Sequence, residues 1–129
     1  MKYEYQSGSY YDGEMLNGDF NGKGIFYFNN GDMYEGDFEN DMFNGMGIYK
    51  FKSGSSYNGP FVNDEFHGIG TYKFDDGSVE KGKFHQGKRV GKFIQIENGE
   101  YFQIVYNNDK MASFNNINKD DISKEKMPE

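Results

Sequence analysis

Small, aromatic and polar positions alternate along most of the chain in a pattern that repeats. Glycines recur every 23 residues, at Gly8, Gly31, Gly54 and Gly77, and the next interval, to Gly99, is one residue shorter. A fixed period of this size indicates an array of small structural units.

Each unit contains two segments whose aromatic residues and glycines are spaced two apart. The first carries a tyrosine, a glycine and a further apolar residue, as at Tyr34, Gly36 and Phe38, and the second closes on two aromatics, as at Tyr49 and Phe51. Residues two apart share one face of an extended strand, so each unit is predicted to be a β-hairpin.

Two kinds of link connect these strands. Between units lie NNGD, KSGS and DDGS, at 29–32, 52–55 and 75–78, where a glycine supplies the positive φ of a tight turn. The link within a unit, such as ENDMFNG at 39–45, is expected to be a longer loop whose aromatic folds back over the sheet. The paired glycines after it indicate places where a ring packs on bare backbone, and a phosphate cradle is the alternative.

The repeats predict an all-β fold, an elongated single-layer antiparallel sheet of stacked β-hairpins. Residues 1–106 show no helical period, so the rings must pack on their own neighbours along the strip. The expected boundaries are a half repeat at 1–7, repeats at 8–30, 31–53, 54–76 and 77–98, and a closing strand at 99–106.

The fourth unit departs from the pattern, as terminal repeats commonly do. Glu80 stands where tyrosine is expected and Phe93 where the second glycine belongs. In the next strand Ile104 occupies the glycine position, which predicts a closing strand that is less able to accept another repeat.

Residues 107–129 are polar and form either a tail or a cap. In the cap alternative, Met111, Phe114 and Ile117 line one side of a short helix over the open sheet edge. Disorder is an equal alternative for the last ten residues.

Three consecutive stretches carry a family resemblance: YDGEMLNGDFNGKGIFYFNNG, YEGDFENDMFNGMGIYKFKSG and YNGPFVNDEFHGIGTYKFDDG. Their Tyr-X-Gly start, central Asn-Gly or His-Gly, second glycine and closing aromatic strand resemble the MORN repeat, over residues 3 to about 100. The resemblance implies a curved sheet of hairpins and a scaffold role, often at cytoskeletal, ciliary or membrane-associated sites.

Composition narrows the functional classes further. Aromatic residues make up 19% of the 129 residues, and the mean hydropathy of -0.94 argues against a conventional aliphatic core. No apolar run approaches the length that a bilayer requires. The absence of cysteine and of an apolar leader favours a cytoplasmic location.

Few residues are candidates for catalytic, metal or cofactor chemistry. His67 and His85 are the only imidazoles and belong to different repeats. GDFNGKG at 18–24 lacks the Gly-Lys-Ser/Thr ending of a phosphate loop, and DKMASFNNINKDD at 109–121 lacks the glycine and glutamate of a calcium loop. We therefore expect no enzymatic activity, no metal site and no cofactor.

The net charge of -7 lies in the repeats, since residues 1–87 hold fourteen acidic and seven basic side chains and 88–129 hold seven of each. An acidic surface disfavours nucleic acid and anionic lipid as partners. One basic cluster within twelve residues is the exception. It either protects the sheet end against edge pairing or binds phosphoinositide headgroups. It comprises Lys81, Lys83, Lys88, Arg89 and Lys92.

The primary interpretation is a non-enzymatic scaffold or adaptor. Rings that recur on one face are predicted to form a groove for a helix or extended segment of a protein partner, and the acidic rim favours a basic, amphipathic one. The alternative is that the rings only pack on one another. Partner identity, the face that binds and pairing into a homodimer stay open. The predicted groove residues are Tyr34, Phe38, Tyr49, Phe51, Tyr57, Phe61, Tyr72 and Phe74.

Overall fold

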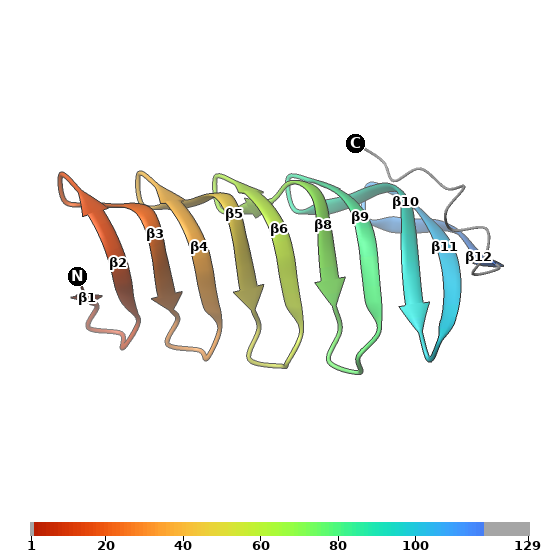
Figure 1. The fold of residues 1–129 in the computed structure, drawn as a ribbon, viewed down its shortest axis with the longest axis horizontal. Coiled ribbons are helices and arrows are strands. Elements are labelled where there is room, and N and C mark those ends of the chain that lie inside the picture. Colours follow the sequence, from red (N-terminus) through yellow and green to blue (C-terminus); the bar gives the residue numbers. More distant parts are fainter. Residues whose placement is uncertain (1, 118–129) are drawn as a thin grey trace.

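The computed structural model describes residues 2–117 and folds them into one open antiparallel sheet without helices (Figure 1). Neighbouring strands follow chain order, except that β7 and β8 share one position beside β6. The predicted fold class of stacked hairpins in a single layer is confirmed. The strands are β1 (Lys2–Glu4), β2 (Tyr10–Leu16), β3 (Asp19–Tyr27), β4 (Met33–Glu39), β5 (Met42–Lys50), β6 (Ser56–Val62), β7 (Glu65–Phe66), β8 (Gly68–Lys73), β9 (Val79–His85), β10 (Lys88–Glu97), β11 (Glu100–Asn107) and β12 (Lys110–Ile117).

Two-residue turns join the strands within each hairpin. Between β4 and β5 the turn is Asn40 and Asp41, with φ of 51° and 69°, and the flanking residues Glu39 and Met42 pair directly. Positive φ at both turn residues is typical of a type I′ turn, whose twist matches that of antiparallel strands. The longer loop predicted for 39–45 is therefore wrong.

Longer connections lie between the first four hairpins instead, whereas β10 and β11 are joined by the two-residue turn of Asn98 and Gly99. In residues 28–32 the Phe28 amide donates to the Asp32 carbonyl at 3.0 Å, and the Gly31 amide donates to the Phe28 carbonyl at 3.1 Å. Gly31 has the predicted positive φ, at 101°. A β-turn does form at the predicted place, but inside a five-residue loop.

A buried tyrosine in each of three repeats organises one side of the sheet, which we name the ring face after Tyr11, Tyr34 and Tyr57. Tyr34 has no exposed surface, and its ring lies across Gly36 and Gly47 of two paired strands. Its hydroxyl donates to the Asp37 carbonyl at 2.7 Å. Tyr11 and Tyr57 make the equivalent hydrogen bonds, to the carbonyls of Glu14 and Pro60.

The two glycines of each pair do different things. A Cβ on the second one, Gly47, would overlap the ring of Tyr34, as the prediction of a ring on bare backbone requires. The first one, Gly45, has a φ of 107°, a left-handed conformation that glycine adopts without steric cost. The first glycine is thus required by the backbone conformation, and the second is required by the packing of the tyrosine ring.

Ring contacts connect each repeat to the next. Tyr57 stacks on Phe66 with centroids 4.0 Å apart, and it meets Phe61 and Phe84 edge to face, each at 5.1 Å. Because Phe84 belongs to the following repeat, the tyrosine spans the junction. The buried core is therefore a continuous row of rings rather than a centre enclosed by layers.

The C-terminal end differs from the prediction. Residues 110–117 form β12, which pairs with β11, so the short helix predicted through Met111, Phe114 and Ile117 is wrong, and 99–106 is not a closing strand. The tight turn at Asn108 and Asp109 and the unpaired edge of β11 favour a fifth hairpin over a helix. The alternative of disorder in the last ten residues concerns residues outside the described range.

Replacing Gly70 by alanine is expected to lower the free energy of unfolding by about 1 to 3 kcal/mol or more, the usual cost of overpacking. The new Cβ would lie 2.5 Å from Cε2 of Tyr57. Thr71→Ala, beside it on the opposite face, should cost less than about 1 kcal/mol. Urea denaturation followed by circular dichroism measures both, and equal midpoints would contradict the packing of the ring on Gly70.

Alkaline pH is expected to unfold the sheet. Burial raises the pKa of Tyr57 from 10.0 to about 12, and it also raises the pKa of Tyr34 and Tyr49. The fold thus favours neutral tyrosine, and this stabilisation is complete below pH 10 and is lost as the pH rises toward 12. Urea midpoints should fall through this window, and should fall less in Tyr57→Phe. A midpoint that stays constant from about pH 9 to 12 would show that tyrosine burial does not control stability.

Candidate protein-binding groove

A ridge of partly exposed rings runs along the ring face beside the buried core. Successive rings lie 4.7, 5.6, 4.7, 6.0 and 4.9 Å apart between centroids, so the ridge is continuous across three repeats. It lies toward the five-residue loops. In order, it consists of Phe26, Phe28, Tyr49, Phe51, Tyr72 and Phe74.

Two hollows accompany this ridge. The larger, of about 470 Å³, is near the N-terminal end, where Phe26 and Phe28 face Asp41 and Asp64. The smaller, of about 240 Å³, is two repeats further on, where Tyr72 and Phe74 are among its walls. Each hollow lies between ridge rings and hairpin-turn residues, and we name the strip that contains both of them the groove.

Aspartates at the hairpin turns form the other rim of the groove and also fasten one repeat to the next. Asp41 accepts a hydrogen bond from the Phe20 amide at 2.7 Å, while its own amide donates to the Phe20 carbonyl at 3.0 Å. Asp64 makes the same pair of hydrogen bonds with Phe43. These two turns thus pair with a strand of the preceding hairpin, and each places a carboxylate beside the rings.

The structure divides the eight predicted groove residues into two groups. Tyr34, Phe38, Tyr57 and Phe61 are at most 4% exposed and belong to the core. The other four are partly exposed and lie on the ridge: Tyr49, Phe51, Tyr72 and Phe74. The core group offers no surface to a partner.

Sequence reasoning missed several residues that do line the groove. Phe20, Phe26, Phe28 and Phe43 belong to the larger hollow, and the turn aspartates form its rim. The repeat contained the signal, since Asn40-Asp41 and Asn63-Asp64 are 23 residues apart. The 23-residue spacing alone does not show that these turns fold toward the ring face, where they bring the aspartates beside the rings.

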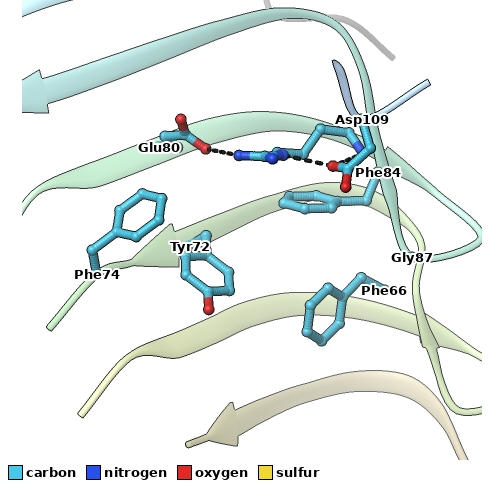
Figure 2. Close-up of a pocket in the computed structure, with 8 residues that line it drawn as sticks. Phe66, Tyr72, Phe74, Glu80, Phe84, Gly87 and Asp109 are labelled. Atoms are coloured by element: carbon cyan, nitrogen blue, oxygen red, sulfur yellow. Dashed lines mark hydrogen bonds and ion pairs between the residues drawn. The ribbon is translucent and has the colours of Figure 1, made fainter. Parts of the chain in front are cut away.

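A polar network replaces the stacked rings at the fourth repeat, above the smaller hollow (Figure 2). Glu80, 3% exposed, occupies the tyrosine position, and it accepts hydrogen bonds from the Tyr106 hydroxyl at 2.5 Å and from Nη1 of Arg89 at 3.2 Å. Arg89 also donates from Nε to Asp109 at 2.7 Å, and its guanidinium lies 4.2 Å from the Tyr106 ring centroid.

Charge complementarity stabilises this network. Burial alone would raise the pKa of Asp109, but the hydrogen bonds and charge of Arg89 hold it below its usual value. Burial would likewise lower the pKa of Arg89, yet Asp109, Tyr106 and Glu80 raise it. Asp109 and Arg89 therefore both stay ionised at neutral pH, and their opposite charges hold the network together.

The predicted basic cluster is divided between the two faces. Arg89 points into the network on the ring face, whereas Lys81, Lys83 and Lys88 lie on the opposite side, which we name the back face. Lys92 lies at the bulge between Val90 and Phe93. Three of the five predicted cations are thus separated from Arg89 by the thickness of the sheet.

The two histidines, distant in sequence, lie side by side on the back face, with ring centroids 5.0 Å apart. His67 interrupts the strand between β7 and β8, where its amide donates to the Pro60 carbonyl. Among residues 2–117, no group of three or more histidine, cysteine or carboxylate side chains is arranged to hold a metal ion. The same residues include no helix long and apolar enough to cross a membrane.

These features define a class: an all-β repeat protein with a single-layer sheet and an aromatic groove. The MORN repeat family model matches residues 11–33, 34–56 and 57–79, in register with the three buried tyrosines. The chain belongs to the MORN repeat family, a non-enzymatic motif that generally serves protein- or membrane-associated adaptors. A search of curated proteins found no significant match.

Arg89→Met is expected to destabilise the protein by about 3 kcal/mol, because it leaves the Glu80 carboxylate buried without its cation. Lys88→Met, on the exposed opposite face, is the matched control and should change stability by less than about 0.5 kcal/mol. Adding Glu80→Gln to Arg89→Met should recover part of the loss. Equal effects of Arg89→Met and Lys88→Met in thermal denaturation would show that the network does not support the fourth repeat.

Proposed function

We propose that this protein is a non-enzymatic scaffold that binds a helical segment of a partner protein in the groove of the ring face. The observation that carries the proposal is the unbroken row of partly exposed rings beside carboxylates at the hairpin turns. Contiguous apolar surface on a protein commonly marks a binding site, and rigid aromatic rings offer large contact areas at low entropic cost.

The backbone of the sheet favours a helical occupant. Backbone groups beneath the groove already pair with neighbouring strands, so an occupant that lies on the rings finds few hydrogen-bonding partners there. A buried peptide backbone needs its hydrogen bonds satisfied, and a helix satisfies them internally. An extended segment suits the sheet edges better than the groove.

Charge favours a basic occupant. Asp41 and Asp64 stand at the larger hollow, and Glu80 and Asp109 outweigh Arg89 at the smaller one. Lysine or arginine on the flanks of an amphipathic helix would lie near these carboxylates and could also contact ring faces. The carboxylates at both hollows disfavour an acidic helix.

The alternative, a phosphoinositide adaptor acting through the fourth repeat, has weaker support. Its lysines share the back face, but Arg89 is engaged with Glu80 and Asp109 on the other side. We propose the groove as the principal site, and a cytoplasmic, cytoskeleton- or cilium-associated location as the cellular setting.

A synthetic amphipathic helix with leucine and phenylalanine on one side and lysine on the other tests the groove by fluorescence anisotropy. Wild type should bind it more tightly than a peptide in which glutamate replaces lysine. Phe28→Ser with Phe74→Ser, which removes one ridge ring beside each hollow, should weaken binding at least tenfold.

The control for this experiment is Ile48→Ser on the back face, which should leave affinity unchanged. Asp64→Asn, which keeps an acceptor for the Phe43 amide, should reduce the preference for the basic peptide and its salt dependence. Equal affinity for both peptides, or no effect of the ring substitutions in a folded variant, would refute the groove as the binding site.

A further inference from the structure

The back face of the sheet has a charge arrangement that the groove does not explain. Cross-strand partners share a face, so the pairing of Asp12 with Ile25 and of Ile25 with Glu35 places all three there. The same reasoning places Ile69, Lys83 and Val90 on it. This face therefore mixes aliphatic and charged residues, whereas the ring face is aromatic.

The N-terminal half of the back face, on β2 to β4, is acidic. Six carboxylates lie there, and the lysine among them, Lys23, is already paired with Asp37. Lys2 on the neighbouring β1 faces the same side. The six are Asp12, Glu14, Asp19, Glu35, Asp37 and Glu39.

The C-terminal half, on β7 to β10, is basic. Four lysines and the two neighbouring histidines face the same side, and Glu65 is the carboxylate among them. Lys81 is exposed and Lys83 is half-buried. The four lysines are Lys73, Lys81, Lys83 and Lys88.

Between these halves the back face has an apolar patch toward the hairpin turns, with Lys50, Ser56 and Asn58 toward the five-residue loops. Met46 on β5 pairs with Pro60 on β6, and Ile48 lies beside them. Met46 is 56% exposed and Val62 is 43% exposed, although both are apolar. The boundary between β5 and β6 is also the midpoint between the acidic strands and the basic ones.

We propose that two copies of this chain associate through their back faces, related by a two-fold axis that runs parallel to the strands between β5 and β6. This rotation places the acidic half of each copy on the basic half of the other. Counting strands outward from the axis, β9 of one copy lies over β3 of the other. Lys81 then falls opposite Ile25, between Asp12 and Glu35 of the second copy.

Symmetry makes this arrangement closed and self-complementary. The rotation forms two equivalent contacts between acidic and basic halves and brings the two apolar centres together. A two-fold axis perpendicular to the strands would instead place acidic half on acidic half and basic half on basic half. The lysines of the basic half thereby gain a ligand of opposite charge, the acidic half of a second copy. The proposal is independent of the groove, because both ring faces stay open, on opposite sides of the dimer.

The available area is sufficient. Eleven strand positions about 4.8 Å apart, with strands about 23 Å long, give a face of roughly 1,100 Å². A typical specific interface buries about 800 Å² on each partner. Twisted sheets that overlap over about three-quarters of the face reach this size.

Light scattering after size-exclusion chromatography tests the dimer. Wild type should have twice the chain mass at low salt and should shift toward the monomer as sodium chloride rises to about 0.5 M, where screening is strong. The variant Asp12→Lys with Glu35→Lys should be monomeric, because in both symmetry-related contacts lysines would then face lysines. Lys81→Glu with Lys83→Glu should be monomeric for the converse reason.

Mixing the two variants supplies the decisive arm. Asp12→Lys with Glu35→Lys makes both halves of the back face basic, and Lys81→Glu with Lys83→Glu makes both halves acidic. The two variants are therefore complementary, and their mixture should form a heterodimer although each variant alone does not dimerise. A fourfold variant that carries all the substitutions should dimerise again. Phe28→Ser with Phe74→Ser, which alters only the groove, should leave the dimer intact.

Three results would overturn the proposal. They are a monomeric wild type at every concentration and salt, variants that still dimerise while folded by circular dichroism, and a mixture that stays monomeric. A monomeric wild type that binds phosphatidylserine vesicles, and loses binding with Lys81→Glu and Lys83→Glu, would assign the basic half to anionic lipid instead.

Discussion

The fold depends on a tyrosine ring that lies flat across a pair of glycines and ends on a backbone carbonyl. Tyr34 covers Gly36 and Gly47 and donates to Asp37, so one side chain fills the space above two strands and also fixes the bulge between Gly36 and Phe38. Stacked and edge-to-face rings then join each tyrosine to its neighbours. A single-layer sheet has no second layer of secondary structure to cover its core. Here the phenylalanine rings that stack on the buried tyrosines cover them instead.

The fourth repeat shows what happens when this constraint changes. With Glu80 in the tyrosine position, the space above Gly82 would be empty, and Phe93 fills it from the neighbouring strand. Gly82 is the last glycine in the row of cross-strand neighbours. On the following strands the same position is occupied by Phe93, Ile104 and Phe114. The two departures visible in the sequence are therefore one compensated exchange, and the buried carboxylate that results is satisfied by Arg89 and Tyr106.

The sequence predicted the hairpins and the ring-on-glycine packing because both depend on spacing within one repeat. It did not predict which rings stay exposed, because Tyr34 and Tyr49 pair on the same face and differ only in depth. It misplaced the longer connection because Phe43 lies within β5, where the sequence suggested a loop. Met111, Phe114 and Ile117 matched a helical spacing, but the open edge of β11 and the turn before β12 outweighed that local pattern. The proximity of His67 and His85 depends on pairing across repeats, which spacing alone does not show.

The aspartates at the hairpin turns of the second and third repeats give the strip a direction. Asp41 completes the hydrogen bonds of Phe20, 21 residues earlier, and Asp64 does the same for Phe43. In both cases the turn of the later hairpin adds hydrogen bonds to a strand of the earlier one, beyond the pairing of the neighbouring strands. A chain that emerges from the ribosome would acquire its structure in the same order, each unit becoming secure when the next turn forms, and the strip would fold as a vectorial process that advances one hairpin at a time.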